Sequence, residues 1–152
     1  MLRIFNNFGP GEYPGKYRNV IPNFMRRVLK GEPLVITGTG DETRDFTFVD
    51  DTVRALRLAM DRPEAVGMTF NVGTGCETSV KRLAQLIVAT CGRKVAIEYQ
   101  PRRGWDSVDR RSADVGLIRE RLGFQASVDL ETGLAKLHQW FLENRIAELE
   151  PR

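Results

Sequence analysis

The sequence has only two cysteines, Cys76 and Cys91, and one histidine, His138. Two cysteines build neither a disulfide framework nor a metal cluster, and Cys91 falls on the apolar side of an expected helix, as a core residue would. A lone histidine in a long C-terminal helix provides neither a Ser-His-Asp set nor a histidine-rich metal site. Because cysteines are so few, we expect a reducing compartment and a cytoplasmic protein.

Long apolar runs are also missing, so the sequence predicts no membrane-spanning helix, and its start lacks a signal-peptide pattern. Its 23 Lys and Arg against 20 Asp and Glu give a net charge of +3, too mild to hold nucleic acid by charge alone. The 152 residues are 41% hydrophobic, which is enough to bury one core. We expect a single domain over 1–152, with no nucleic-acid or membrane partner.

Strand and helix patterns alternate along the chain, which predicts an α/β fold, with α+β as the alternative. The expected strands lie at 2–6, 34–37, 68–72 and 95–99. The expected helices begin at residues that can cap them: Asn19, Asp50 or Asp51, Thr78 or Ser79, Asp114 and Asp129.

The chain is organised around residues 38–51, Gly-Thr-Gly-Asp-Glu-Thr-Arg-Asp-Phe-Thr-Phe-Val-Asp-Asp. Gly38 and Gly40 allow a turn with positive φ that other residues resist. Phe46 and Phe48 follow on one face of a short strand. The next segment has apolar residues at helical spacing: Val53, Leu56, Ala59 and Met60.

Arg44 lies where this glycine turn leads into the short strand. A guanidinium held in such a position suits bidentate contact with a phosphate. The alternative is an ordinary ion pair with Asp41 or Asp45.

A polar loop from Gln100 to Ala113 carries further arginines around Trp105. These are Arg102, Arg103, Arg110 and Arg111. Such a loop could grip a diphosphate while the aromatic ring covers a sugar or base. The alternative is a solvated loop whose charges pair with Asp106 and Asp109.

The segment Gly73-Thr74-Gly75 follows an expected strand and mimics the start of a dinucleotide-binding unit. Such a unit needs a third glycine for close helix–strand packing. Thr78 stands at that position and is better explained as a helix cap. An isolated Gly-x-Gly is a weak signal for a cofactor.

Four segments in this order resemble one known family. They are Leu-Arg-Ile-Phe-Asn-Asn-Phe-Gly-Pro-Gly at 2–11, the 38–51 stretch, Phe-Asn-Val-Gly-Thr-Gly at 70–75 and Arg-Leu-Gly-Phe at 121–124. Together they resemble the C-terminal, substrate-binding half of an NAD-dependent nucleotide-sugar epimerase/dehydratase, an extended short-chain dehydrogenase/reductase. The resemblance runs from Leu2 to about Phe141. It implies that a few strands belong to an incomplete Rossmann sheet.

The resemblance also implies which residues hold a nucleoside-diphosphate sugar. Asn6 matches the asparagine that touches the sugar or its phosphates, and Arg44 matches the arginine that binds the diphosphate. Asn19 and Val20 match the start of a helix that contacts the ligand. Thr37 departs from the pattern, since many relatives have an aromatic residue there against the base.

The late loop, by the same resemblance, closes over phosphate and ribose. Arg102 or Arg103, with Asp106, matches the residues that do so, and the sequence does not choose between the two arginines. No metal ligand and no catalytic residue is implied within this chain.

The family binds NAD through a glycine-rich N-terminal loop and transfers protons with a Tyr-x-x-x-Lys pair. Neither feature is present in these 152 residues, and none of the three tyrosines has a lysine four residues later. We therefore expect a truncated, non-catalytic portion that lacks the NAD-binding domain and needs no cofactor by itself.

Three other interpretations remain. One is a stand-alone nucleotide or sugar-phosphate binding module with a regulatory role, and another is a structural remnant without a ligand. A small enzyme that uses Gly73-x-Gly75 for NAD is the third. Because open strand edges invite pairing, we expect a homo-oligomer or an N-terminal half bound in trans.

Overall fold

The computed structural model of the chain describes residues 1–15, 20–102, 104 and 108–148. Five α-helices are found in this part: α1 (Val20–Lys30), α2 (Val49–Asp61), α3 (Val80–Cys91), α4 (Gly116–Leu122) and α5 (Leu130–Glu143). Four strands have three or four residues: β1 (Leu2–Ile4), β3 (Leu34–Thr37), β6 (Phe70–Val72) and β8 (Ile97–Gln100). Five have two: β2 (Asn7–Phe8), β4 (Thr43–Arg44), β5 (Thr47–Phe48), β7 (Thr78–Ser79) and β9 (Arg110–Arg111). The predicted α/β fold is confirmed.

The strands pair mainly in parallel. β1 pairs with β6, β2 with β5 and β3 with β8, each as a parallel pair. The remaining sheet has the order β7-β4-β9, in which β4 is antiparallel to β7 and parallel to β9. Since parallel neighbours need long connections, these pairs join segments that are far apart in the sequence.

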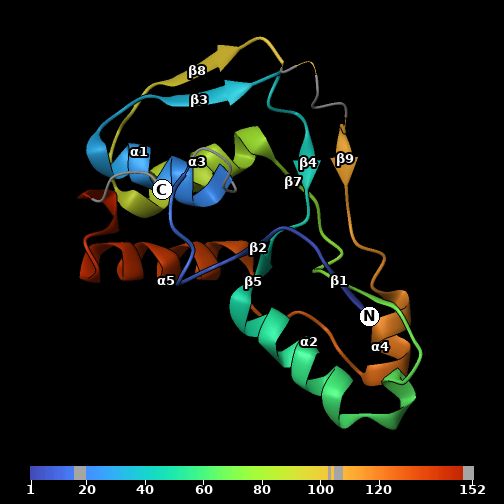
Figure 1. The fold of residues 1–152 in the computed structure, drawn as a ribbon. Coiled ribbons are helices and arrows are strands. Elements are labelled where there is room, and N and C mark those ends of the chain that lie inside the picture. The colour runs from blue at the N-terminus through green and yellow to red at the C-terminus, as the bar shows by residue number, and fades with distance from the viewer. Residues whose placement is uncertain (16–19, 103, 105–107, 149–152) are drawn as a thin grey trace.

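The described chain has two lobes (Figure 1). In the larger lobe, the pair β3-β8 lies across α1, α3 and α5, and one apolar cluster fills the space between them. The smaller lobe contains β1, β6, α2 and α4 around a second cluster that includes Ala55, Phe70 and Phe124. The small sheet β7-β4-β9 lies along the side where the two lobes meet.

Close packing joins α5 to the strand pair β2-β5. Gly133 of α5 faces Phe8 and Phe48, whose rings lie edge to face with centroids 5.4 Å apart. A Cβ atom at position 133 would lie 2.7 Å from the Phe8 ring, so only glycine fits without a shift. Phe46 and Phe48 are both buried, as their expected common face requires.

Two of the expected helix caps are confirmed. The Ser79 hydroxyl accepts a hydrogen bond from the Arg82 amide, and the Asp129 carboxylate accepts one from the Thr132 amide. Asp114 lies two residues before α4, where its carboxylate accepts a hydrogen bond from the Gly116 amide at 3.0 Å.

The expected cap of α2 is wrong. Phe48 occupies the cap position without a side-chain hydrogen bond, and α2 begins at Val49, so Asp50 and Asp51 lie in its first turn. Asp51 instead faces the interior, where a distant segment supplies donors for its carboxylate. No pattern within the helix itself predicts that tertiary contact.

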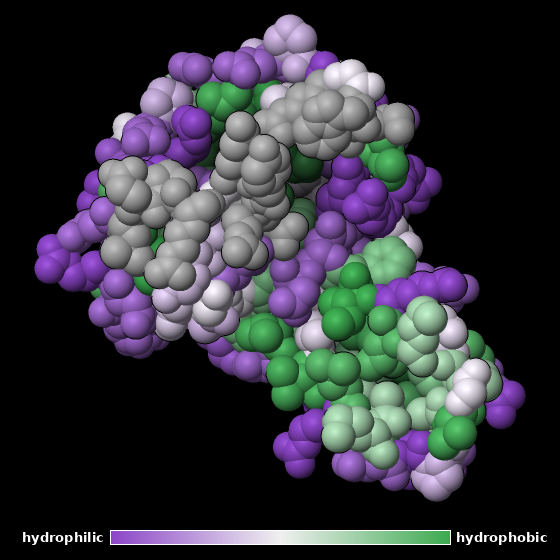
Figure 2. All heavy atoms as spheres, viewed as in Figure 1, coloured by the Kyte–Doolittle hydropathy of each residue, from purple (hydrophilic) through white to green (hydrophobic). Residues whose placement is uncertain are grey.

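The apolar residues of α2 form the expected helix, but several of them point outward. Val53 is 49% exposed, Leu56 41% and Met60 82%, whereas the buried positions are Asp51, Thr52 and Ala55. Figure 2 shows an apolar surface that extends over the smaller lobe, beside a largely hydrophilic larger lobe. Within the described residues, no helix combines the length and apolar character needed to cross a membrane.

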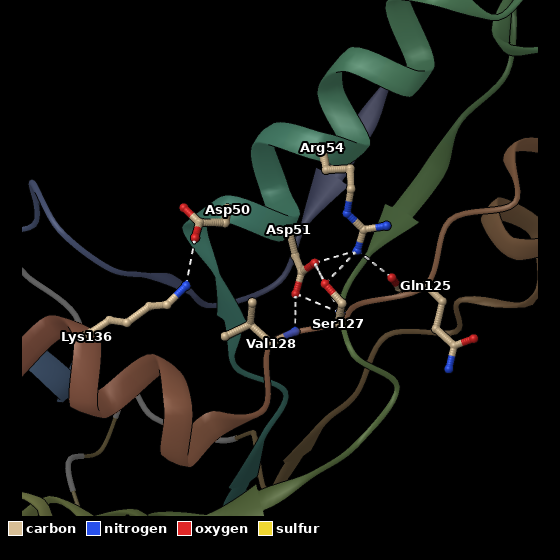
Figure 3. A network of polar contacts seen from close by, with 7 residues as sticks. All are labelled: Asp50, Asp51, Arg54, Gln125, Ser127, Val128 and Lys136. Atoms are coloured by element: carbon tan, nitrogen blue, oxygen red, sulfur yellow. Dashed lines mark hydrogen bonds and ion pairs between the residues drawn. The ribbon is translucent and has the colours of Figure 1, made fainter.

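Asp51 anchors the segment before α5 to the start of α2 (Figure 3). Its carboxylate, 1% exposed, accepts hydrogen bonds from the Ser127 and Val128 amides at 3.0 and 2.9 Å and from the Ser127 hydroxyl. Arg54 donates both to Asp51 and to the Gln125 carbonyl. Burial alone would raise the pKa of Asp51, but the hydrogen bonds from Arg54, Val128 and Ser127 together lower it below its ordinary value.

We predict that Asp51→Asn lowers the free energy of unfolding by about 3 kcal/mol at neutral pH. The asparagine side chain replaces one acceptor oxygen of the carboxylate with an NH₂ group, which is itself a donor and cannot accept from the Ser127 and Val128 amides. A depressed pKa stabilises the fold above the pKa of the unfolded chain, and this contribution is lost as the pH falls below about 4. Urea unfolding at neutral and acid pH should therefore show a difference between wild type and variant that shrinks in acid.

Asp50→Asn provides the matched control, because Asp50 is the exposed neighbour that pairs with Lys136 at 3.2 Å. We expect a change below about 1 kcal/mol for this surface pair. Equal losses in the two variants would contradict the assignment of Asp51 as the anchor.

Candidate functional site

Arg44 is positioned by β4, the central strand of the sheet β7-β4-β9. It is paired with Thr78 on one side and with Arg111 on the other. Its Nη1 donates to its neighbour's carbonyl, that of Thr43, at 2.8 Å and to the Asp109 carbonyl at 3.5 Å. The guanidinium is therefore directed toward the chain that enters β9.

Arg102 approaches the same point from the far end of the polar loop. Its Nη1 forms an ion pair with the Asp109 carboxylate, while the backbone carbonyl of Asp109 accepts hydrogen bonds from Arg44 and from the Thr43 amide. The structure thus brings two of the predicted residues, Arg44 and Arg102, together around Asp109.

Asp45, the residue after Arg44, is completely buried and connects three segments. Its carboxylate accepts hydrogen bonds from the Thr74 and Gly75 amides, both at 2.9 Å, from the Thr74 hydroxyl and from the Ala113 amide at 3.2 Å. These contacts fix the backbone on which Arg44 is carried, because a buried carboxylate with several donors has one favourable arrangement.

Asn6 reaches this position from the end of β1. Its side-chain amide donates to the Asp45 carbonyl at 2.9 Å, and its carbonyl accepts a hydrogen bond from the Thr47 amide. The backbone at Asn6 has a φ of 24°, which is uncommon outside glycine and is best tolerated by asparagine and aspartate. Asn6 therefore lies against the backbone beside Arg44.

Thr37 lies close to the segment that carries Arg102, whereas Val20 lies in another part of the larger lobe. Thr37 ends β3 opposite Gln100, two positions before Arg102, and the Gly38 amide donates to the Gln100 carbonyl at 2.9 Å. Val20 is the first residue of α1 and packs against the apolar cluster of the larger lobe. None of its contacts in the described part of the chain joins it to Arg44.

The other predicted site residues, Asn19, Arg103 and Asp106, lie outside the described residues. Trp105 of the polar loop also falls there. Whether these residues complete the site stays a prediction.

Among the described residues, neither of the two ion pairs considered for Arg44, with Asp41 or with Asp45, is formed. The carboxylate of Asp45 faces Thr74, Gly75 and Ala113, and Asp41 makes no ion pair within the described part of the chain. For the polar loop, in contrast, the expected pairing is found in part, because Arg102 does pair with Asp109.

The segment Gly73-Thr74-Gly75 does not fit a dinucleotide phosphate. The amides of Thr74 and Gly75, which would have to bind the phosphates, already donate to Asp45. A Cβ atom at Gly73 would collide with the Ala113 side chain, so this glycine allows protein packing rather than approach of a cofactor. The hypothesis that this segment binds NAD therefore lacks support.

Arg111 is a site candidate that the sequence did not single out from the loop. It is the direct neighbour of Arg44 across the β4-β9 pair. Arg110, the residue before it, binds Glu77, which also accepts a hydrogen bond from the Thr43 hydroxyl. The hydrogen bonds from Arg110 and then Thr43 lower the pKa of Glu77. If β9 had been recognised as a strand, the alternation of side chains along it would have placed Arg110 and Arg111 on opposite faces.

Chemically, the site is an α/β scaffold on which arginines from separate segments converge near an asparagine amide. Guanidinium groups in such an arrangement suit phosphate or carboxylate oxygens. Within the described residues, no group of three or more His, Cys, Asp or Glu side chains is placed to hold a metal ion. The chemistry of these residues therefore suits an anionic ligand.

Comparison with known proteins agrees with this arrangement. Residues 1–73 match the NAD dependent epimerase/dehydratase family. A decarboxylase of UDP-N-acetyl-alpha-D-glucosaminuronate from Bacillus cytotoxicus is 35% identical over 148 residues, which cover 94% of this chain and 46% of that protein. The chain belongs to the NAD dependent epimerase/dehydratase family.

Solved structures show the same fold. An epimerase of Methanothermobacter thermautotrophicus is 44% identical with a TM-score of 0.92, over 95% of this chain and 43% of that one. The UDP-glucose 4-epimerase of Thermotoga maritima, solved with UDP-glucose, is 35% identical with a TM-score of 0.89, over 95% and 46%. The chain thus spans about half the length of the relatives that it matches.

Proposed function

We propose that these 152 residues form the nucleotide-sugar-binding portion of an NAD-dependent epimerase/dehydratase. The ligand is a nucleoside-diphosphate sugar whose diphosphate is held by Arg44 and Arg102. Asn6 lies beside the sugar or its phosphates, and Thr37 lies toward the base. In this proposal Asn19, Val20, Arg103 and Asp106 complete the contacts.

The observation that carries the proposal is the convergence of Arg44 and Arg102 on Asp109. Two guanidiniums from segments almost sixty residues apart meet at Asp109, Arg44 at its carbonyl and Arg102 at its carboxylate. Asn6 binds the backbone carbonyl of Asp45, the residue after Arg44. A diphosphate has acceptor oxygens enough for both, and bidentate contacts of this kind are among the stronger hydrogen bonds. The Thermotoga maritima relative, solved with UDP-glucose, supports this choice of ligand.

The chemical step, in this proposal, depends on residues that these 152 do not include. The sequence has no Tyr-x-x-x-Lys pair to act as general base, and Gly73-x-Gly75 does not fit a dinucleotide. We therefore assign ligand binding to this chain, and hydride and proton transfer to an NAD-binding half supplied elsewhere.

Isothermal titration calorimetry tests the proposal directly. UDP-glucose and dTDP-glucose are titrated separately into the purified chain, with glucose alone as the control ligand. We expect measurable, saturable binding of at least one nucleotide sugar and none of glucose. Absence of binding for both nucleotide sugars would refute the proposal.

The smaller lobe supports a proposal about partners. Its exposed apolar residues include Ile4, Leu56, Met60 and Leu117. Among the described residues β1 and β6 pair only with each other, so each has an open edge. Surfaces of this kind bind other protein, and we propose a homo-oligomer through this lobe or an NAD-binding half bound in trans.

We predict that the chain alone sediments or scatters light as a dimer or larger species. Leu56→Glu, which places a charge on this surface, should shift it toward monomer. Leu142→Glu is the control, because Leu142 is 57% exposed on α5 in the larger lobe. A monomer at high concentration, or equal effects of the two substitutions, would argue against a homo-oligomer built on this surface.

A further inference from the structure

The Asp109 carboxylate binds an arginine that the proposed function assigns to the ligand. It accepts a hydrogen bond from Nη1 of Arg102 at 2.5 Å. This ion pair lies at the surface, where the side chain of Asp109 is 76% exposed and that of Arg102 is 33% exposed. A carboxylate presents oxygens to a guanidinium much as a phosphate does. An anionic group of the protein itself therefore occupies a guanidinium that the diphosphate is proposed to use.

The backbone of Asp109, just before β9, is held by contacts that do not involve its side chain. Its carbonyl accepts hydrogen bonds from the Thr43 amide at 2.9 Å and from the Arg44 side chain at 3.5 Å. Two residues later, the Arg111 carbonyl accepts a hydrogen bond from the Asp45 amide at 2.9 Å. The pairing of β4 with β9 therefore fixes this backbone whether or not the Asp109 carboxylate is bound.

The residue after Asp109 holds the same backbone by its side chain. Arg110 forms an ion pair with Glu77, and Glu77 also accepts a hydrogen bond from the Thr43 hydroxyl. Within the described part of the chain, Arg102 is the only partner of the Asp109 carboxylate. The carboxylate can therefore leave Arg102 while every other contact of this segment stays in place.

We propose that Asp109 is an internal competitor of the ligand: its carboxylate must leave Arg102 before the diphosphate of a nucleotide sugar binds there. This inference rests on the proposed function, which assigns Arg102 to the diphosphate. The apparent affinity is then reduced by the fraction of molecules in which Arg102 is released. Because both side chains reach solvent, the exchange needs no opening of the fold.

Calorimetry with UDP-glucose on two matched variants tests the inference. Asp109→Asn and Asp41→Asn each remove one negative charge from an exposed side chain, but only Asp109 binds Arg102. We expect Asp109→Asn to tighten binding about two- to fivefold, which is the range that loss of an exposed ion pair allows. Asp41→Asn should change the affinity less than about 1.5-fold. Weaker or unchanged binding in Asp109→Asn would overturn the inference, because a carboxylate that orients Arg102 for the ligand would give the opposite sign.

A double-mutant cycle separates competition for Arg102 from a general effect of charge. In an Arg102→Gln chain the carboxylate has no guanidinium to occupy, so the addition of Asp109→Asn should change the affinity less than about 1.5-fold. Nuclear magnetic resonance titration measures this, since it also reports weak binding. A gain as large as in the chain with Arg102 would overturn the inference alone. A wild-type chain that binds no nucleotide sugar would overturn the proposed function with it.

Discussion

Asp45→Ala should lower the free energy of unfolding by about 4 kcal/mol or more, a very large effect for one substitution. The carboxylate is fully buried and serves donors from Thr74, Gly75 and Ala113. Without it the amides of Thr74, Gly75 and Ala113 lose their acceptor, and an amide left unsatisfied in the interior, as at the buried Ala113, costs roughly 1–3 kcal/mol. Urea unfolding followed by circular dichroism measures the loss.

Asp41→Ala is the matched control, since Asp41 is exposed in the same glycine-rich segment. We expect its free energy of unfolding to stay within about 0.5 kcal/mol of wild type. An Asp45→Ala variant as stable as Asp41→Ala would show that the buried carboxylate does not hold the three segments together.

Arg44→Ala should reduce affinity for UDP-glucose about a hundredfold, which is the second largest effect that we expect. The guanidinium supplies charge and a two-pronged donor to the diphosphate, and alanine supplies neither. Arg44→Lys keeps the charge but not the fork, so we expect a loss of about tenfold. Calorimetric titration measures both.

Arg119→Ala serves as the control for that series, because Arg119 is exposed on α4 in the smaller lobe. Its affinity for UDP-glucose should equal that of wild type, and circular dichroism should show all three variants folded. An Arg44→Ala variant that binds as tightly as Arg119→Ala would remove Arg44 from the site.

The adjacent residues Arg44 and Asp45 have different roles: Asp45 stabilises the fold, and Arg44 is proposed to bind the ligand. Because side chains alternate along a strand, Asp45 turns into the protein while Arg44 turns toward Asp109. The inward carboxylate holds the segments around 74 and 113, and those segments in turn fix the strand from which the guanidinium extends. The stability and the proposed binding of this region therefore depend on neighbouring residues with opposite charges.

The sequence predicts the longer elements well. Apolar spacing predicts the helix that becomes α1, and the short apolar run at 34–37 matches β3 in both bounds. Ser79 and Asp129 cap their helices as expected, since a cap is a local interaction between a side chain and an amide three residues on. Local chemistry of this kind can be read without knowledge of the fold.

Tertiary contacts are what the sequence does not reveal. The two-residue strands β4 and β9 exist only because segments 43–44 and 110–111 meet, so neither has a periodic pattern of its own. For the same reason Asp51 is mistaken for a cap and Asp45 for an ion-pair partner of Arg44. The backbone amides that donate to the two carboxylates, those of Thr74, Gly75, Ala113, Ser127 and Val128, lie 29 to 77 positions away.

Nuclear magnetic resonance of the nitrogen-labelled chain with UDP-glucose tests the central claim most directly. The account predicts that the largest shifts on titration fall on the backbone amides of Thr43, Arg44, Asp109 and Arg111, and that the amides of α4 stay unchanged. Largest shifts within α2 and α4, or no shift at any concentration of the nucleotide sugar, would contradict it.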